Sequence, residues 1–124
     1  MISIVNLIIG GAAGTVARYG LALAVNRACG AQFPYGTLAV NASGCLLVGI
    51  FASLAEEKFL LGSNARMLLM IGFCGAFTTF STFILETSHL IRDGETLRAF
   101  MNVMVSVTIG FILFRIGVWI GKVI

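Results

Sequence analysis

Four long apolar runs dominate the chain and leave few folds open to it. They cover about residues 2–25, 37–55, 65–90 and 99–120. A helix needs roughly 20 apolar residues to cross the hydrocarbon core of a bilayer, and each run meets that length. Only short connections remain between the runs, so there is no room for a soluble domain. We therefore predict one all-α membrane domain, residues 1–124, with four transmembrane helices.

Composition agrees with this prediction. Hydrophobic residues make up 59% of the chain and charged residues 10%, and the mean hydropathy is +1.04. A soluble domain of this size needs more polar surface than the chain offers. No basic residue precedes the first run, which is too long for the apolar part of a signal peptide. We expect that run to remain in the mature protein.

The basic residues are balanced between the two ends of such a bundle. Lys58, Arg66 and Lys122 fall on the side of both termini, and Arg27, Arg92 and Arg98 fall on the opposite side. Orientation normally follows an excess of Lys and Arg in cytoplasmic loops, and this count has none. It predicts insertion in both orientations, so that a chain can pair with an inverted copy of itself. The alternative is a weak bias that counting misses.

The third run predicts a helix that is broken near its middle. Gly72, Gly75, Thr78 and Thr79 are poor helix formers placed close together. Non-helical backbone at membrane depth is tolerated only where it is buried in protein or lines a cavity. Such a break exposes carbonyl groups and helix ends that can bind ions.

Two phenylalanines and a hydroxyl stripe follow the expected break. At 100° per residue, Phe80 and Phe83 lie within about 60° of each other, and Thr79, Thr82 and Glu86 form the adjoining stripe. An aromatic ring carries positive charge at its edge, so ring edges can replace part of the water around a small anion. The alternative is ordinary packing of the two rings. We expect Glu86 to pair with a cation or a hydroxyl near the membrane surface.

Polar residues in the other runs each allow two interpretations. Arg18 either faces a water-filled cavity or extends to the lipid headgroups. Asn41 either bonds another helix or binds a passing ion.

Gly10 and Gly14 have the GxxxG spacing of close helix packing, while Asn102, Ser106 and Gly110 suggest a packing face with two polar members. The three cysteines show no CxxC spacing and are interpreted as small packing residues.

Three segments resemble the Fluc (CrcB-like) fluoride channels of microbial membranes. The matching residues are Gly10–Gly14 with Arg18 and Tyr19, then Gly36–Asn41, then Gly72–Phe83 with Glu86. They fall in three of the four runs, in order. The resemblance implies passive, selective export of fluoride across the cell inner membrane and no enzymatic activity.

The resemblance also implies an assembly and a set of site residues. The assembly is an antiparallel, dual-topology homodimer in membrane lipid, with two fluoride pathways and a structural Na⁺ at its centre, and with no nucleic acid partner. The implied fluoride pathway comprises Asn41, Phe80, Phe83, Thr79, Ser81 and Thr82, together with Ser106 or Thr108 from the fourth run. Backbone carbonyls of Gly75 and Thr78 are implied to bind Na⁺, and Arg18 to line a vestibule.

Two positions depart from the family pattern, and two other functions compete with it. Ala76 stands where a second glycine is frequent, and Gly110 where some relatives carry serine. A small dual-topology multidrug or cation exporter would need an acid deep in the membrane, whereas Glu86 lies near the end of its run. A non-transporting assembly subunit would not need hydroxyls beside paired aromatics. Because both phenylalanines and Asn41 occur in one chain, a homodimer is favoured over two different subunits.

Overall fold

The computed structural model describes residues 2–124, and all regular structure in that range is helical. The helices are α1 (Ile2–Cys29), α2 (Tyr35–Glu56), α3 (Ser63–Arg66), the π-helical η1 (Met67–Cys74), α4 (Gly75–Phe77), α5 (Phe80–Arg92) and α6 (Thr96–Val123). The segments from α3 to α5 follow one another as a single composite span. Four stretches are therefore long and apolar enough to cross a membrane, which confirms the predicted architecture.

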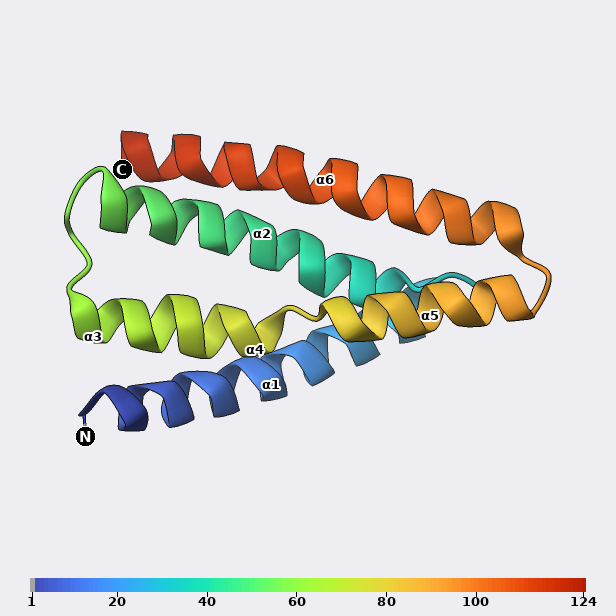
Figure 1. Ribbon diagram of the computed structural model, residues 1–124, viewed down its shortest axis with the longest axis horizontal. Coiled ribbons are helices and arrows are strands. Elements are labelled where there is room, and N and C mark those ends of the chain that lie inside the picture. The colour runs from blue at the N-terminus through green and yellow to red at the C-terminus, as the bar shows by residue number, and fades with distance from the viewer. Residues whose placement is uncertain (1) are drawn as a thin grey trace.

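The four spans run up and down, with short connections at both ends. Both termini and the loop at residues 57–62 lie at one end, and the connections at 30–34 and 93–95 lie at the other (Figure 1). Most helices extend a few residues beyond the predicted runs. Hydropathy marks the part of a helix in the hydrocarbon core, whereas the helix itself continues into the headgroup region.

Glycines bring α2 and α6 into backbone contact along much of their length. A Cβ atom on Gly49 would overlap the carbonyl oxygen of Phe114, and one on Gly117 would overlap that of Leu46. Within lipid, helices gain little from the hydrophobic effect and associate through such close packing. The pair α2 and α6 is the most extensively packed part of the molecule.

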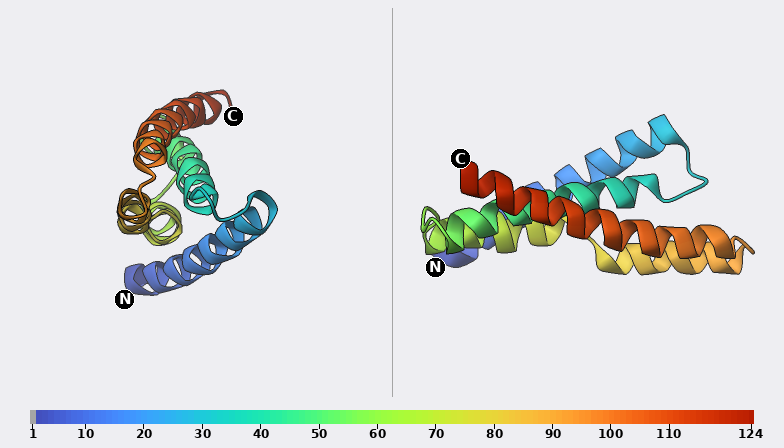
Figure 2. Two further views of the ribbon diagram at one scale, coloured as in Figure 1. Left: turned by 90° about the vertical axis from the view of Figure 1, so that its right-hand side faces the viewer. Right: turned by 90° about the horizontal axis from the view of Figure 1, so that it is seen from above.

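The GxxxG glycines of α1 make an equally close contact with the first half of the third span. A Cβ atom on Gly10 would overlap the carbonyl oxygen of Leu68, and one on Gly14 would overlap that of Phe73. The contact ends with α4, and the C-terminal half of α1 then diverges from α5 and α6 (Figure 2). As a result, α5 packs chiefly on α6 and to a smaller extent on α2.

The third span is broken at Thr78 and Thr79, as the sequence predicts. Thr78 has φ −90° and ψ 157°, and Thr79 has φ −149° and ψ 114°, both extended conformations. Ala76 lies inside α4 with a helical backbone, so the residue at this position does not need the conformational freedom of glycine. The departure from the family pattern at Ala76 therefore leaves the break intact.

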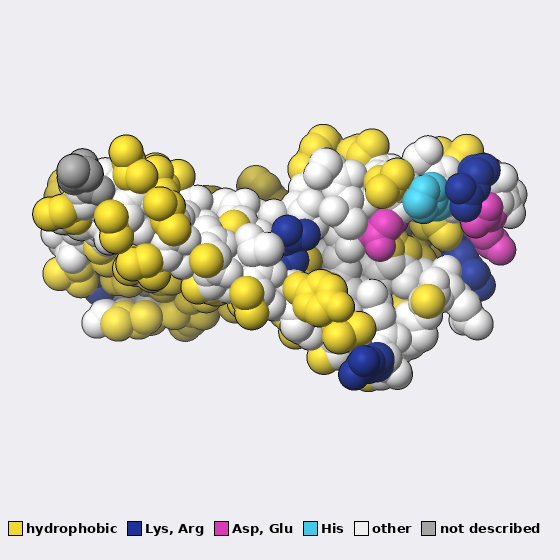
Figure 3. All heavy atoms as spheres, turned by 90° about the horizontal axis from the view of Figure 1, so that it is seen from below, with side chains coloured by type: hydrophobic (Ala, Val, Ile, Leu, Met, Phe, Trp, Pro, Cys, Tyr) yellow, Lys and Arg dark blue, Asp and Glu magenta, His cyan; other side chains and the backbone are white. Residues whose placement is uncertain are grey.

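The molecular surface is mostly apolar, as expected for a protein whose solvent is lipid. Large side chains such as Ile8, Val16 and Phe111 are exposed. On the face seen in Figure 3, hydrophobic side chains cover the half that contains the N-terminal end, and acidic side chains and the histidine gather at the opposite end. The charged end corresponds to the connection between α5 and α6.

Candidate functional site at the break in the third span

Asn41 of α2 stabilises the break in the third span through two hydrogen bonds. The backbone N–H of Thr79 donates to Asn41 Oδ1 at 2.7 Å, and Asn41 Nδ2 donates to the Thr79 carbonyl at 2.9 Å. One side-chain amide thus satisfies both backbone groups of a residue that has left the helix, which membrane depth requires. Asn41 thus bonds another span, which is one of the two interpretations that the sequence allowed. The second hydrogen of Nδ2 makes no hydrogen bond within residues 2–124.

Arg18 caps the other side of the break. Its Nε donates to the carbonyl oxygen of Ala76 at 2.9 Å, one of the last carbonyls of α4. A cation is favourable at a helix C-terminus because the carbonyl ends of the peptide dipoles gather there. The contact holds the Arg18 head at the break, so the interpretation of Arg18 as a headgroup anchor is wrong.

Three carbonyls at the break receive no hydrogen bond from the described residues. The Cys74 carbonyl accepts two hydrogen bonds from Thr78, one from the N–H at 3.1 Å and one from the hydroxyl at 2.9 Å. No hydrogen bond described for residues 2–124 is made to the carbonyls of Gly75, Phe77 and Thr78. Carbonyls without a donor at a helix break suit Na⁺. The two predicted ligands, Gly75 and Thr78, are too few for a complete site, so these residues fit a sodium ion only if another chain supplies the remaining oxygens.

The hydroxyls of Thr79 and Thr82 form the start of α5. Thr79 Oγ1 accepts from the Thr82 N–H at 3.2 Å, which makes Thr79 the N-cap. The same Thr79 hydroxyl donates to Thr82 Oγ1 at 3.0 Å. The structure therefore brings the predicted hydroxyls Thr79 and Thr82 together beside Asn41. Ser81 lies on the exposed side of α5, away from this group.

The two phenylalanines are close to each other but differ in burial. The ring centroids of Phe80 and Phe83 are 5.9 Å apart, with 49° between the ring planes. Phe80 is 74% exposed, whereas Phe83 is 8% exposed. An exposed aromatic ring beside unwound backbone is available to another chain or to an ion, while Phe83 is fixed by its neighbours.

A hollow of about 290 Å³ opens at the break. Its lining residues are Asn41, Cys45, Val48, Thr78, Thr79, Phe80 and Phe114. Polar groups come from the break and from Asn41, and apolar walls come from α2 and α6. The sequence singled out the polar members, while Val48 and Phe114 were missed because an apolar residue in an apolar helix carries no signal of which face it occupies.

The fourth span contributes one of its two candidate hydroxyls to the inner side. Ser106 is partly buried and donates to Asn102 Oδ1 at 3.3 Å. Thr108 is exposed on α6, because two residues turn a helix by about 200°. Gly110 faces α2, where an added Cβ would lie 3.3 Å from Cys45 Sγ. The structure therefore leaves little room for the serine that some relatives carry at Gly110.

A buried polar chain links α6 to α5. Asn102 Nδ2 donates to Thr87 Oγ1 at 2.9 Å, and Thr87 Oγ1 donates to the Phe83 carbonyl at 2.7 Å. Asn102 is 2% exposed and Thr87 is 8% exposed. No role was predicted for Thr87, although its position four residues after Phe83 allows this bond to the preceding turn.

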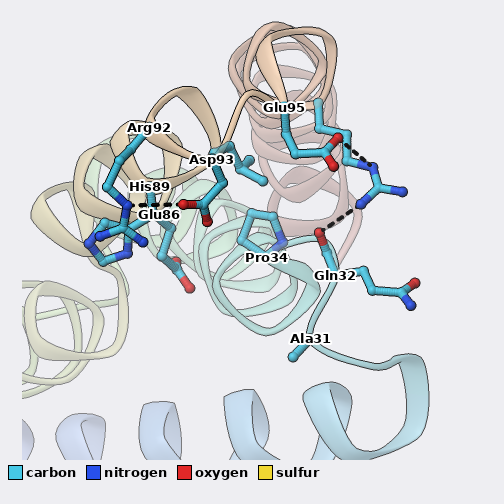
Figure 4. A pocket seen from close by; sticks show the side chains of 10 residues that line it. Ala31, Gln32, Pro34, Glu86, His89, Arg92, Asp93 and Glu95 are labelled. Atoms are coloured by element: carbon cyan, nitrogen blue, oxygen red, sulfur yellow. Dashed lines mark hydrogen bonds and ion pairs between the residues drawn. The ribbon is translucent and has the colours of Figure 1, made fainter.

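A second hollow, of about 420 Å³, lies at the membrane surface beyond α5 (Figure 4). Its lining residues are Ala31, Gln32, Pro34, Glu86, His89, Leu90, Arg92, Asp93, Glu95 and Arg98. Arg92 Nε donates to Asp93 at 3.0 Å, and this hydrogen bond lowers the pKa of Asp93 below its ordinary value. Arg98 donates to the Gln32 carbonyl at 3.4 Å and thereby joins α6 to the connection before α2.

Glu86 extends from α5 into this second hollow (Figure 4). Its Oε1 atom is buried and has no hydrogen-bond partner among the described residues. The expectation that Glu86 pairs with a cation or a hydroxyl is therefore wrong for this oxygen within a single chain.

Comparison with known proteins places these features in a family. A family model described as CrcB-like protein, Camphor Resistance (CrcB), matches residues 5–118. A protein of Geobacter sulfurreducens is 45% identical over 121 residues, which cover 98% of this chain and 94% of the relative. A protein of Nitrosococcus oceani is 43% identical over 114 residues, 92% of this chain and 91% of the relative. Both relatives are named fluoride-specific ion channel FluC. This chain belongs to the CrcB-like family.

Proposed function

We propose that this protein is a fluoride-selective ion channel that lowers cytoplasmic fluoride by passive export of the anion. The observation that carries the proposal is the family: relatives that align over nearly the whole chain are named fluoride-specific ion channels. The break in the third span supports it, because hydroxyls, an amide and aromatic rings gather there at membrane depth. No chemical step is required of any residue.

The proposed pathway runs beside Asn41, Thr79, Thr82 and the rings of Phe80 and Phe83. Fluoride is small and holds its water strongly, so a pathway must replace that water with several donors of moderate strength. The free hydrogen of Asn41 Nδ2 and the positive edges of the rings can serve as such donors. A path lined this closely favours fluoride over the larger chloride ion.

We propose that two chains in opposite orientations complete the pathway. The balanced Lys and Arg count supports insertion both ways. The hollow at the break is open at the molecular surface, and Phe80 is largely exposed there, so a second copy is needed to enclose an ion. Each chain would then contribute residues to both of two pathways.

A structural Na⁺ at the centre of this dimer is part of the proposal. The carbonyls of Gly75 and Thr78 would hold it, together with the same groups of the inverted copy. A bound cation would neutralise the carbonyl dipoles that the break leaves at membrane depth, where no water replaces the missing bonds. Arg18, bonded to Ala76 O at 2.9 Å, adds positive charge beside the same segment.

The membrane potential supplies the driving force. Fluoride enters cells as neutral HF from acidic surroundings and ionises at the higher internal pH. An inside-negative potential then drives the anion outward with about 2.3 kcal/mol per charge for each 100 mV. A channel is sufficient for this task, and no exchange of protons or cations is required.

The experiment is fluoride efflux from liposomes that contain only the purified protein, followed with a fluoride-selective electrode. Chloride efflux is measured in parallel, and protein-free liposomes serve as the control. We expect rapid release of fluoride without release of chloride. Equal release of both anions would contradict selectivity, and release of neither would contradict channel activity by this chain alone.

A further inference from the structure

The half-helix α5 carries Phe83 but has little support from its surroundings. It is separated from α4 by the extended residues 78–79, and its packing is chiefly on α6. At its N-terminal end it is held through Thr79, which bonds to Asn41. Farther along, the buried contact between Thr87 and Asn102 is its polar link to α6. The rotation of α5 therefore depends on few contacts.

The directions of the hydrogen bonds in this link follow from one fixed acceptor. The Phe83 carbonyl can only accept, so the Thr87 hydroxyl must donate to it, at 2.7 Å. The Thr87 oxygen must then accept from Asn102, which places the Asn102 NH₂ group toward α5. The remaining Asn102 carbonyl faces Ser106, whose hydroxyl donates to it at 3.3 Å. Each proton has one position, and the chain has a single direction.

We propose that Thr87 and Asn102 are positioning residues that set the rotation of α5 on α6 and thereby hold Phe83 against Phe80. The proposal rests on the proposed fluoride pathway. The link binds the backbone carbonyl of Phe83 itself, so a change in the link acts first on the residue whose ring borders the pathway. Neither positioning side chain needs to touch the ion.

Burial makes the link sensitive to the loss of a single hydroxyl. Asn102 is almost fully enclosed, and the side chains beside Thr87 are mostly apolar, so water is a poor replacement for a lost partner. A hollow of about 280 Å³ lies next to the link between α5 and α6 and is lined in part by Thr87, Ala99 and Val103. Its volume gives α5 room to turn once the hydrogen bonds are gone.

The test compares Thr87→Val, which keeps the shape and removes the hydroxyl, with Thr87→Ser, which keeps the hydroxyl. Fluoride efflux of the Val variant should fall about ten-fold, because the unpaired Asn102 N–H would disfavour the present rotation of α5 by a factor of about that size, and Thr87→Ser should restore it. Thr15→Val is the matched control, because Thr15 is exposed in the middle of α1. An equal fall in the Val and Ser variants would overturn the proposal.

A second readout does not depend on ion flux. Protein labelled with 4-fluorophenylalanine is examined by fluorine NMR, and the Phe83 resonance is assigned from its loss in Phe83→Leu. Thr87→Val should shift or broaden that resonance, while Thr15→Val and Thr87→Ser should leave it in place. An unmoved resonance in Thr87→Val would contradict positioning even if flux falls. If the Phe83 resonance moves in Thr87→Val but the unchanged protein carries no fluoride flux, the positioning role of Thr87 stands and the proposed channel function is refuted.

A double variant checks that the two residues act through one link. Asn102→Leu removes the donor to Thr87, and it should lower fluoride efflux in the same direction as Thr87→Val. If both act through the bond between them, the double variant should be no worse than the stronger single variant. If the fold-reductions in fluoride efflux of the two single variants multiply in the double variant, the two residues have independent roles and the proposed link is overturned.

Discussion

At the residue scale, the break depends on an amide from a different span. Thr79 leaves the helix, and its N–H would be unpaired at membrane depth without Asn41, which also donates to the Thr79 carbonyl. The sequence predicted that the third span breaks and that Asn41 is important. It could not predict their partnership, because the two residues are far apart in the sequence and only tertiary packing brings them together.

Replacing Asn41 should destabilise the fold as well as the pathway. Asn41→Leu leaves the backbone N–H of Thr79 unpaired and removes one of the hydrogen bonds to its carbonyl, and an unpaired group of this kind costs about 1–3 kcal/mol. We expect a clear fall in the unfolding temperature of the purified protein in detergent. The control is Asn64→Leu, because Asn64 is exposed near the membrane surface, and no loss of stability is expected there. Equal effects of the two changes would show that the Asn41 bonds contribute little.

Substitutions of Phe80 and Phe83 should differ in their effects on fluoride efflux and on the unfolding temperature. Phe80 is 74% exposed, so Phe80→Ile should lower fluoride efflux while leaving the unfolding temperature of the single chain nearly unchanged. Phe83 is buried, and Phe83→Ile should lower both. The matched control is Phe111→Ile, since Phe111 is also exposed but lies on α6 outside the break. Full fluoride efflux in Phe80→Ile would refute a role for the ring edge.

At the scale of elements, backbone contact between helices is the main device of the fold. The GxxxG pair in α1 was recognised in the sequence, but its partner segment was not. The π-helical form of η1 was also not predicted, because the residues from 67 to 74 have no composition that distinguishes a π-helix from an α-helix. What the structure adds is that Gly10 and Gly14 meet the carbonyls of η1 directly.

Replacing a glycine of α1 by alanine should lower the stability where the glycine touches another helix and raise it where the glycine has no neighbour. A Cβ atom on Gly14 would overlap the Phe73 carbonyl, so Gly14→Ala must separate the helices and should destabilise by about 1–3 kcal/mol. Gly11 has no neighbouring atom within 4 Å of an added Cβ, so Gly11→Ala should stabilise by up to about 1 kcal/mol. Thermal unfolding of both variants measures the difference. A stabilising Gly14→Ala would contradict the contact with η1.

At the scale of the whole molecule, hydropathy was sufficient to predict four spans and the location of both termini at one end (Figure 1). It could not predict that the second half of α1 diverges from α5 (Figure 2). Hydropathy reports that a helix lies in lipid or protein, but not which helix it faces. The faces that remain open in the single chain are those for which we propose an inverted copy.

Dual insertion can be tested by topology reporters fused after Ile124. We expect signals from both sides of the membrane for the unchanged chain. Replacing Arg27, Arg92 and Arg98 by Gln should move the reporter to the cytoplasmic side, because the remaining basic residues lie at the end of the termini. Replacing Lys58, Arg66 and Lys122 by Gln should move it outward. A one-sided signal from the unchanged chain would refute the antiparallel dimer.

The bonding of Thr79 has a consequence for how a cell could control such a pathway. Both polar groups of the extended residue are already satisfied by Asn41, so closing the break into a continuous helix would require giving up two good bonds. The broken form is the resting form and does not need a signal to create it. For a passive pore of this construction, the number of copies in the membrane sets the total flux, and gene expression is the natural point of control.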